Sequence, residues 1–125
     1  MGQSHPIGTK TILIVDDEPL LRFDLVDFFE AAGWRVFDAE DADQAITILE
    51  GRRKIRVVLT DVQMPGSING LKLAHYIRNR FPPTILYIAS GHVPLREDEL
   101  PVRATFLPKP FDPHRLLRQL ETAIK

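Results

Sequence analysis

Four short segments carry side chains suited to phosphate and metal chemistry. Asp16-Asp17, Asp61, Ser90 and Lys109 each stand at the end of a short apolar run that is typical of a buried strand. Carboxylates bind hard divalent cations such as Mg²⁺, a lysine pairs with carboxylate or phosphoryl oxygens, and a serine hydroxyl donates hydrogen bonds. Gathered in one place, these groups would form a phosphoryl-transfer site in which a carboxylate attacks phosphorus and becomes an aspartyl phosphate.

Each of these residues also has an ordinary structural interpretation. Asp17 stands two residues before Pro19, where it could cap a helix, and Asp61 and Ser90 could be turn residues. An isolated lysine such as Lys109 is usually a surface charge. Only their convergence would favour the chemical interpretation, so the elements that carry them decide the question.

Strand-like and helix-like segments alternate along the chain. We expect strands at 11–15, 34–38, 55–60, 84–89 and 104–107, with helices after Pro19, Asp41, Gly70 and Asp112. Asp41 and Gln44 have the spacing of a capping box. This alternation predicts an α/β, doubly wound fold, with a parallel sheet covered by helices on both faces. Ligands of such sheets bind at the carboxyl ends of the strands, where the acids, the serine and the lysine would meet.

The composition fits one globular domain and excludes several other classes of protein. The chain has 125 residues, of which 44% are hydrophobic and 26% charged, with a net charge of -1 and no cysteine. Disulfides and cysteine-based metal sites are therefore excluded, and no apolar run approaches the roughly 20 residues of a membrane helix. The basic cluster at 52–56 is interpreted as a solvated turn. We expect a cytoplasmic domain over 11–125, a flexible tail over 1–10, and no direct nucleic acid or membrane binding.

The motifs together resemble a receiver domain of two-component response regulators, over nearly all of residues 11–125. Such domains have an acidic pair after strand one, an Asp followed by x-x-Met-Pro after strand three, Ser or Thr before a small residue after strand four, and Lys-Pro-Phe after strand five. In this sequence the four motifs are Asp16-Asp17, Asp61-Val-Gln-Met64-Pro65, Ser90-Gly91 and Lys109-Pro110-Phe111. The set is specific, although each motif alone is weak. The resemblance implies a flavodoxin-like, five-stranded sheet of order 2-1-3-4-5.

The resemblance also implies a phosphorelay function centred on Asp61. A sensor histidine kinase or a histidine phosphotransfer protein would phosphorylate Asp61, and Lys109 would hold the phosphoryl group. Mg²⁺ would be bound by Asp17, by Asp61 and by the backbone carbonyl of Gln63, with Asp16 acting through a water molecule. The domain would be a phosphoacceptor that assists its own phosphorylation and dephosphorylation, and no enzyme in the ordinary sense.

Further roles implied by the resemblance concern signal output. Ser90 would contact the phosphoryl group and Phe106 would change rotamer with it, which would alter a surface for a downstream protein or a homodimer. Gln63 and His92 occupy the positions that tune access of hydrolytic water. The Lys109-Pro110 bond is expected to be cis.

Three departures from the family pattern carry expectations of their own. Gly70 lies one residue further from Asp61 than the family pattern has it, which predicts a bulge in the loop 66–69. The gap from Ser90 to Lys109 is shorter than usual, so the fourth helix is expected to be short or irregular. Phe106 lacks the hydroxyl of a tyrosine, so its switch would be steric only.

Two other functions are compatible with parts of this pattern. A small aspartyl-phosphate phosphatase of haloacid-dehalogenase type would use related chemistry, but it usually needs an Asp-x-Asp motif after the first strand and a cap over its substrate. This chain has adjacent Asp16-Asp17 and little length for a cap. A receiver-like binding module that ignores phosphorylation is the second alternative, and partner binding indifferent to Asp61→Ala would favour it.

Overall fold

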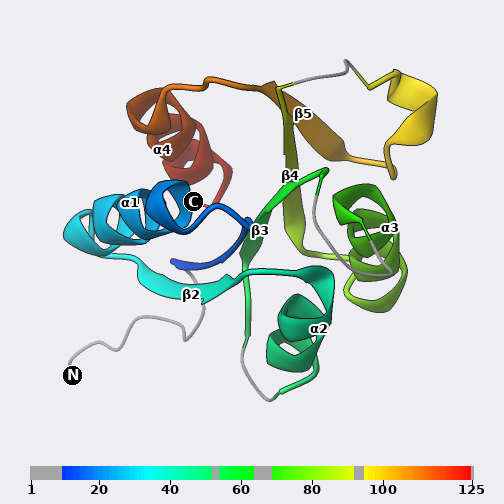
Figure 1. Ribbon diagram of the computed structural model, residues 1–125, viewed down its shortest axis with the longest axis horizontal. Coiled ribbons are helices and arrows are strands. Elements are labelled where there is room, and N and C mark those ends of the chain that lie inside the picture. Colours follow the sequence, from blue (N-terminus) through cyan, green and yellow to red (C-terminus); the bar gives the residue numbers. More distant parts are fainter. Residues whose placement is uncertain (1–9, 52–53, 64–68, 92–94, 125) are drawn as a thin grey trace.

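One parallel sheet with helices on both faces organises the chain (Figure 1). The computed structural model describes residues 10–51, 54–63, 69–91 and 95–124. The strand order is β2-β1-β3-β4-β5, with β1 Thr11–Val15, β2 Arg35–Ala39, β3 Val57–Asp61, β4 Ile85–Ser90 and β5 Ala104–Pro108. The helices are α1 Pro19–Ala31, α2 Ala42–Glu50, α3 Gly70–Arg80 and α4 Pro113–Ala123, with a 3₁₀ turn η1 at Glu97–Glu99. The predicted α/β, doubly wound fold and its strand order are confirmed.

The core consists of two apolar layers, one on each face of the sheet. Helices α1 and α4 cover one face and α2 and α3 cover the other (Figure 1). Every residue of β1 is buried, which explains why that strand is a continuous apolar run without alternation. Ile12 and Ile14 point into the α1/α4 layer, whereas Leu13 and Val15 point into the α2/α3 layer. The central strands are therefore fixed from both sides, and so are the side chains at their ends.

Two helices begin at the capping residues that the sequence predicts. The Asp41 carboxylate accepts a hydrogen bond of 2.8 Å from the Gln44 backbone N–H, and Asp112 accepts one of 2.9 Å from the His114 N–H. The return bond of the capping box is different from the expected one. The Gln44 side chain accepts from the N–H of Glu40 at 3.1 Å, one residue before the cap. Strand β1 has the expected bounds, and those of the other strands differ from the expected ones by at most two residues.

Helix α3 begins against the backbone that carries Asp61. A Cβ atom on Gly70 would lie 1.7 Å from the Asp61 carbonyl oxygen, so only glycine allows this approach. The Gly70 N–H donates to the Val62 carbonyl at 2.9 Å, and the Asn69 side chain caps the helix by accepting from the Lys72 N–H. The bulge predicted for 66–69 falls almost entirely outside the described residues. At its start, α3 is thus joined directly to the end of β3.

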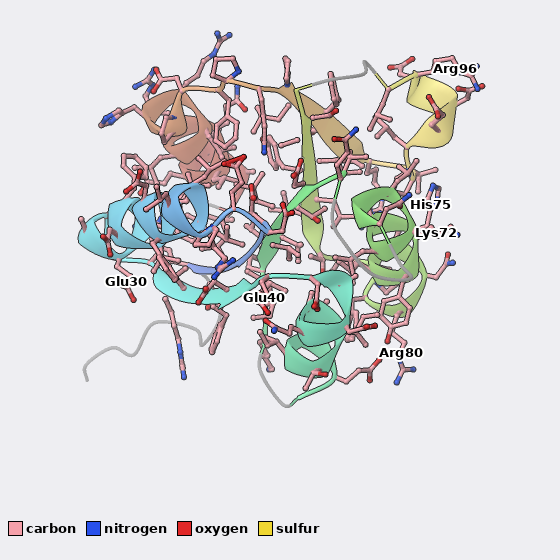
Figure 2. All side chains as sticks on the ribbon, viewed as in Figure 1. Glu30, Glu40, Lys72, His75, Arg80 and Arg96 are labelled. Atoms are coloured by element: carbon pink, nitrogen blue, oxygen red, sulfur yellow. The ribbon has the colours of Figure 1, made fainter. Side chains whose placement is uncertain are left out.

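In the described part of the connection from β4 to β5, residues 91 and 95–103, the helical structure is the single turn η1, so the prediction of a short or irregular fourth helix is confirmed. Helix α3 holds this connection. The buried Arg78 guanidinium donates to the Val102 carbonyl of this connection at 2.7 Å and to the Thr84 carbonyl, just before β4, at 2.9 Å. His75 also projects from α3 (Figure 2), and one of its ring nitrogens lies 2.9 Å from the Glu99 carbonyl. These contacts replace the packing that a longer helix would supply.

The described part of the chain begins with a residue that contacts the domain. Residues 1–9 lie outside the described part, and Lys10 already contacts the domain, because its carbonyl accepts from the Arg35 N–H at 2.8 Å. The division of the chain at residue 10 remains a prediction.

Within 10–51, 54–63, 69–91 and 95–124, none of the helices combines the length and apolar character needed to cross a bilayer.

Candidate functional site

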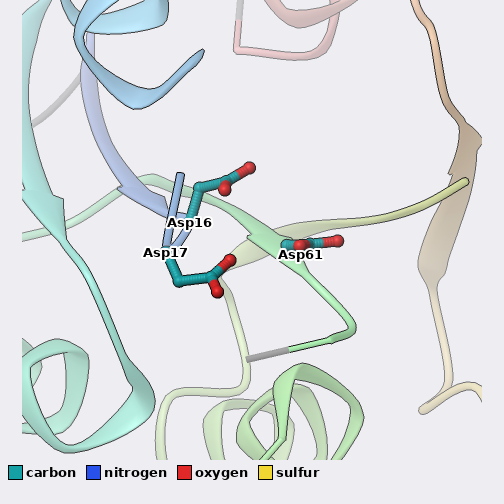
Figure 3. A group of neighbouring side chains, drawn as sticks. All are labelled: Asp16, Asp17 and Asp61. Atoms are coloured by element: carbon teal, nitrogen blue, oxygen red, sulfur yellow. The ribbon is translucent and has the colours of Figure 1, made fainter. Parts of the chain in front are cut away.

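Three carboxylates meet where β1 and β3 end. These strands are neighbours in the sheet, so Asp16 and Asp17, which follow β1, come close to Asp61, the last residue of β3. One oxygen from each of the three lies within 4.8 Å of the others (Figure 3). The predicted convergence of the acids is therefore present. Hard oxygen donors at this spacing are the kind of ligands that Mg²⁺ takes in proteins.

Lys109 reaches the acids from the end of β5, on the opposite side of β3 from β1. It follows β5, and its ammonium nitrogen lies 3.3 Å from an Asp16 oxygen and 3.4 Å from an Asp61 oxygen. The Lys109, Asp16 and Asp61 side chains are only 19%, 6% and 12% exposed, so solvent screens these pairs less than it would at a surface. Among the described side chains, Lys109 is the cation paired with this cluster of three carboxylates, which leaves an excess of negative charge for a further cation.

Burial and neighbouring charge shift the protonation of two of these groups. Burial raises the pKa of Asp61, Lys109 opposes this shift, and the nearby Asp16 carboxylate adds to it. Burial on its own would lower the pKa of Lys109, but Asp16 and Asp61 outweigh it and raise that pKa. The lysine is therefore cationic at neutral pH, whereas the ionised form of Asp61 is disfavoured by its burial. Such a group gains most from an added cation.

Asp16 is the most buried of the three acids and is held by the backbone around it. One of its side-chain oxygens accepts from the Glu18 N–H at 2.9 Å, and its own N–H donates to the Ala39 carbonyl at 3.1 Å. Arg22, on α1, donates to the Asp16 carbonyl at 2.8 Å. Sequence reasoning assigned no role to Arg22. The one available signal was its position a single helical turn after the acidic segment.

The remaining expected site residues lie around this cluster or outside the described chain. Ser90 ends β4 and is buried, and its carbonyl accepts from the Lys109 N–H at 3.0 Å, so the two residues are adjacent at the same edge. Gln63 is exposed, two residues after Asp61. Phe106 is half-buried in β5, in register with Ile88 of β4. His92 falls among residues that the structure does not describe.

A comparison with protein families decides what kind of domain carries this edge. The sequence profile of the family described as "Response regulator receiver domain" matches residues 12–121. This chain belongs to the response regulator receiver domain family. Receiver domains are the phosphoacceptors of two-component systems, and they interact with histidine kinases and phosphotransfer proteins. The family binds Mg²⁺ at an acidic pocket, and this receiver domain has Asp16, Asp17 and Asp61 clustered at the corresponding edge.

Curated relatives of this receiver domain include regulators and a kinase. It is 32% identical over 117 residues to "Transcriptional regulatory protein FixJ" of Bradyrhizobium diazoefficiens, covering 91% of this chain and 56% of that protein. It is 33% identical over 125 residues to "Sensor kinase CckA" of Brucella abortus, covering 94% of this chain and 12% of that protein. The chain spans about half the length of the first curated relatives it matches.

Solved structures agree with the fold of this receiver domain. A response regulator receiver protein from Sinorhizobium medicae superposes with a TM-score of 0.82 and 28% identity, covering 92% of this chain and 96% of the other. The receiver domain of the hybrid histidine kinase CckA superposes with a TM-score of 0.76 and 30% identity, covering 92% and 99%. The flavodoxin-like architecture is thus shared with other receivers.

Proposed function

We propose that this receiver domain is a phosphorylation-dependent switch in which Asp61 accepts the phosphoryl group from a sensor histidine kinase or a histidine phosphotransfer protein. The observation that carries the proposal is the position of Lys109, within 3.4 Å of both Asp16 and Asp61 beside three clustered carboxylates. An acid set alone could hold a metal, and a lysine alone could be structural. Their combination suits the transfer of a phosphoryl group to a carboxylate.

The transfer itself is a displacement at phosphorus. An Asp61 carboxylate oxygen attacks the phosphorus of the donor's phosphohistidine, the P–N bond breaks, and the imidazole leaves with the bonding electron pair. Asp61 becomes a mixed anhydride. Lys109 offsets charge on the phosphoryl oxygens, and Ser90, at the neighbouring strand end, donates a hydrogen bond to one of them. Both groups contribute by position and charge, since neither one takes up a covalent bond.

The donor set fits Mg²⁺. Asp17 and Asp61 would hold the ion with the Gln63 backbone carbonyl, and Asp16 would hold it through a water molecule. The fit is supported by three carboxylate oxygens within 4.8 Å and by the negative charge that Lys109 leaves uncompensated. When bound, the ion supplies charge neutralisation for the phosphoryl oxygens. The protein keeps the acids oriented at the ends of β1 and β3.

Signal output in this proposal passes from Ser90 to Phe106. A phosphoryl group that engages Ser90 shifts the end of β4, and Phe106 in the adjacent β5 repacks sterically, because it has no hydroxyl. The surface that changes would contact a downstream protein or a second copy of the chain. Gln63 and His92 would set how fast water removes the phosphoryl group.

Intact-mass measurement tests this proposal directly. Incubation with Mg²⁺ and acetyl phosphate is expected to add one phosphoryl group to the wild type and none to Asp61→Asn. Asp27→Asn, an exposed carboxylate on α1, is the matched control and should be phosphorylated normally. An adduct that persists in Asp61→Asn would contradict the assignment of the phosphoacceptor.

Two further measurements distinguish the alternative functions from the proposed switch. Repeated turnover of a phosphoester without a stable adduct would indicate a phosphatase. Partner binding that is unaffected by Asp61→Ala, with no adduct in the wild type, would indicate a binding module that ignores phosphorylation. The membership of the chain in a family of phosphoacceptors supports the switch over both.

A further inference from the structure

Arg22 is a buried charge next to the acidic edge. It lies one turn into α1, only 7% of the residue is exposed, and its guanidinium has two partners from different strand ends. One nitrogen donates to the backbone carbonyl of Asp16 at 2.8 Å, and Nε donates to the Asp38 carboxylate at 2.9 Å. An arginine is seldom buried to this extent unless it is paired. The side chain therefore joins the carboxyl ends of β1 and β2 through α1.

The Asp16 carbonyl that Arg22 contacts belongs to the peptide unit linking Asp16 to Asp17. This segment is also held through the Asp16 N–H, which donates to Ala39, and through its side chain, which accepts from Glu18. A peptide plane fixed in this way sets the direction in which both acidic side chains leave the backbone. Lys109 contacts the Asp16 side chain, whereas Arg22 is the charged side chain, among those described, that contacts the main chain of this segment.

We propose that Arg22, held in place by Asp38, is a positioning residue for the Asp16-Asp17 acid pair and thereby strengthens Mg²⁺ binding. The inference rests on the proposed Mg²⁺ site and adds a residue to it. Groups that orient metal ligands without touching the metal commonly change affinity by 10-fold or more. Arg22 acts on the acids through a main-chain carbonyl and needs no contact with the ion.

The charge of Arg22 and its orienting role predict opposite changes in Mg²⁺ affinity when Arg22 is removed. The direction of the measured change therefore tests the inference. A guanidinium close to the site repels a divalent cation, so removing it would tighten Mg²⁺ binding if only its field mattered. Its removal also leaves Asp38 unpaired, which adds to that attraction. If Arg22 orients the acid pair, its removal weakens Mg²⁺ binding in spite of the more favourable field.

Calorimetric titration of the whole chain with Mg²⁺ alone gives the required dissociation constants. Arg22→Met is expected to bind Mg²⁺ about 10-fold more weakly than the wild type. Arg22→Lys keeps the charge, but one ammonium group cannot reproduce the guanidinium contacts with both the Asp16 carbonyl and Asp38. The Mg²⁺ affinity of this variant should therefore fall between those of the wild type and Arg22→Met. Arg118→Met, which removes an exposed arginine from α4, is the matched control and should bind like the wild type.

The Mg²⁺ dependence of phosphorylation by acetyl phosphate distinguishes a role of Arg22 in positioning the acids from a role in stabilising the fold. In Arg22→Met the Mg²⁺ concentration for half-maximal rate should rise about 10-fold, while the rate at saturating Mg²⁺ stays close to that of the wild type. A merely structural role would lower the urea midpoint and leave this concentration unchanged. If Arg22→Met does not fold, Arg22→Lys decides, because a pure field effect predicts wild-type affinity for it.

Two results would overturn the inference, and they differ in meaning. Unchanged or tighter Mg²⁺ binding by the folded Arg22 variants, with Asp17→Asn weakened as the proposed site requires, would overturn the role of Arg22 alone. Absence of Mg²⁺ binding by the wild type would overturn the proposed metal site and this inference with it.

Discussion

At the scale of single residues, Asp61 combines a chemical role with an unfavourable position. Its carboxylate is largely removed from solvent and lies in a cluster with Asp16 and Asp17, and Lys109 offsets only part of the repulsion. Burial raises the pKa of Asp61, which means that the folded protein disfavours its ionised form more than the unfolded chain does. The ionised group therefore lowers stability at neutral pH. The domain is therefore less stable when no cation is bound beside Asp61.

The Asp61→Asn variant should therefore be more stable than the wild type when Mg²⁺ is absent. We expect the free energy of unfolding at pH 7 to rise by roughly 1 kcal/mol, because the amide carries no charge to desolvate. Urea unfolding in EDTA measures it, with Asp27→Asn as the control that should change little. Added Mg²⁺ should stabilise the wild type and remove the difference. A less stable Asp61→Asn in EDTA would contradict this account of the site.

The positions of the acids and of Lys109 could be predicted from the sequence, whereas those of the buried arginines could not. The first group follows from one topological rule, since parallel strands place their carboxyl ends at one edge of the sheet. Arg22 and Arg78 look like ordinary helical surface charges in the sequence. Their burial depends on which carbonyls of distant segments lie within reach, and no local pattern encodes that distance.

At the scale of elements, helices α2 and α3 are joined by a cluster on their outer sides. The Glu50 carboxylate, at the end of α2, accepts two hydrogen bonds of 3.0 Å from Arg80 and one from the Tyr76 hydroxyl, both on α3. Arg80 lies on the surface (Figure 2). The Arg80 guanidinium, followed by the Tyr76 hydroxyl, lowers the pKa of Glu50 to about 2. The two helices that cover one face of the sheet are thus linked by an ion pair.

This cluster predicts a pH dependence of stability with a definite sign. Because the pKa of Glu50 is lowered from 4.5 to about 2 on folding, its contribution is present above pH 4.5 and is lost as the pH falls toward 2. Glu50→Gln should lower the urea midpoint at pH 7 and have a smaller effect at pH 3. High salt should reduce the pH 7 difference, since the pair is exposed. Equal effects at both pH values would contradict the assignment.

Element types were easier to predict than element details. Asp112 and Pro113 mark the start of α4 because both act within one turn, and local chemistry decides such starts. The Gln44 side chain instead bonds to the Glu40 N–H, a choice between neighbouring donors that the spacing alone does not resolve. The approach of Gly70 to the Asp61 carbonyl depends on how α3 docks on the sheet.

At the scale of the whole molecule, the β4–β5 connection depends on α3 for its order. One turn, η1, is too short to bury an apolar face of its own, although Leu95 and Leu100 pack beside the α2/α3 layer. Arg78 donates to two carbonyls of this connection, those of Val102 and Arg103, from inside the protein. The short connection is therefore held in place by a charged side chain of α3, where a longer connection would have a helix of its own.

Arg78→Met should destabilise the whole domain. Charge-assisted hydrogen bonds to several carbonyls are lost, and the Thr84 carbonyl among them is buried, so we expect a loss of about 3 kcal/mol in the free energy of unfolding. Arg80→Met, two residues further along α3, breaks only an exposed pair and should cost clearly less. Urea unfolding compares the two, and hydrogen exchange should locate the added opening of Arg78→Met in β5. Equal losses in both variants would refute the role of Arg78.

Helix α3 has one more consequence, which is mechanical. It is about 16 Å long, and it touches the backbone of Asp61 through Gly70 at one end and clasps the β4–β5 connection through Arg78 near the other. A helix of this length moves as a rigid rod. We therefore expect a displacement of the chain at Asp61 to reach beyond the loop after β3, because α3 also contacts the carbonyls of the segment that leads into β5.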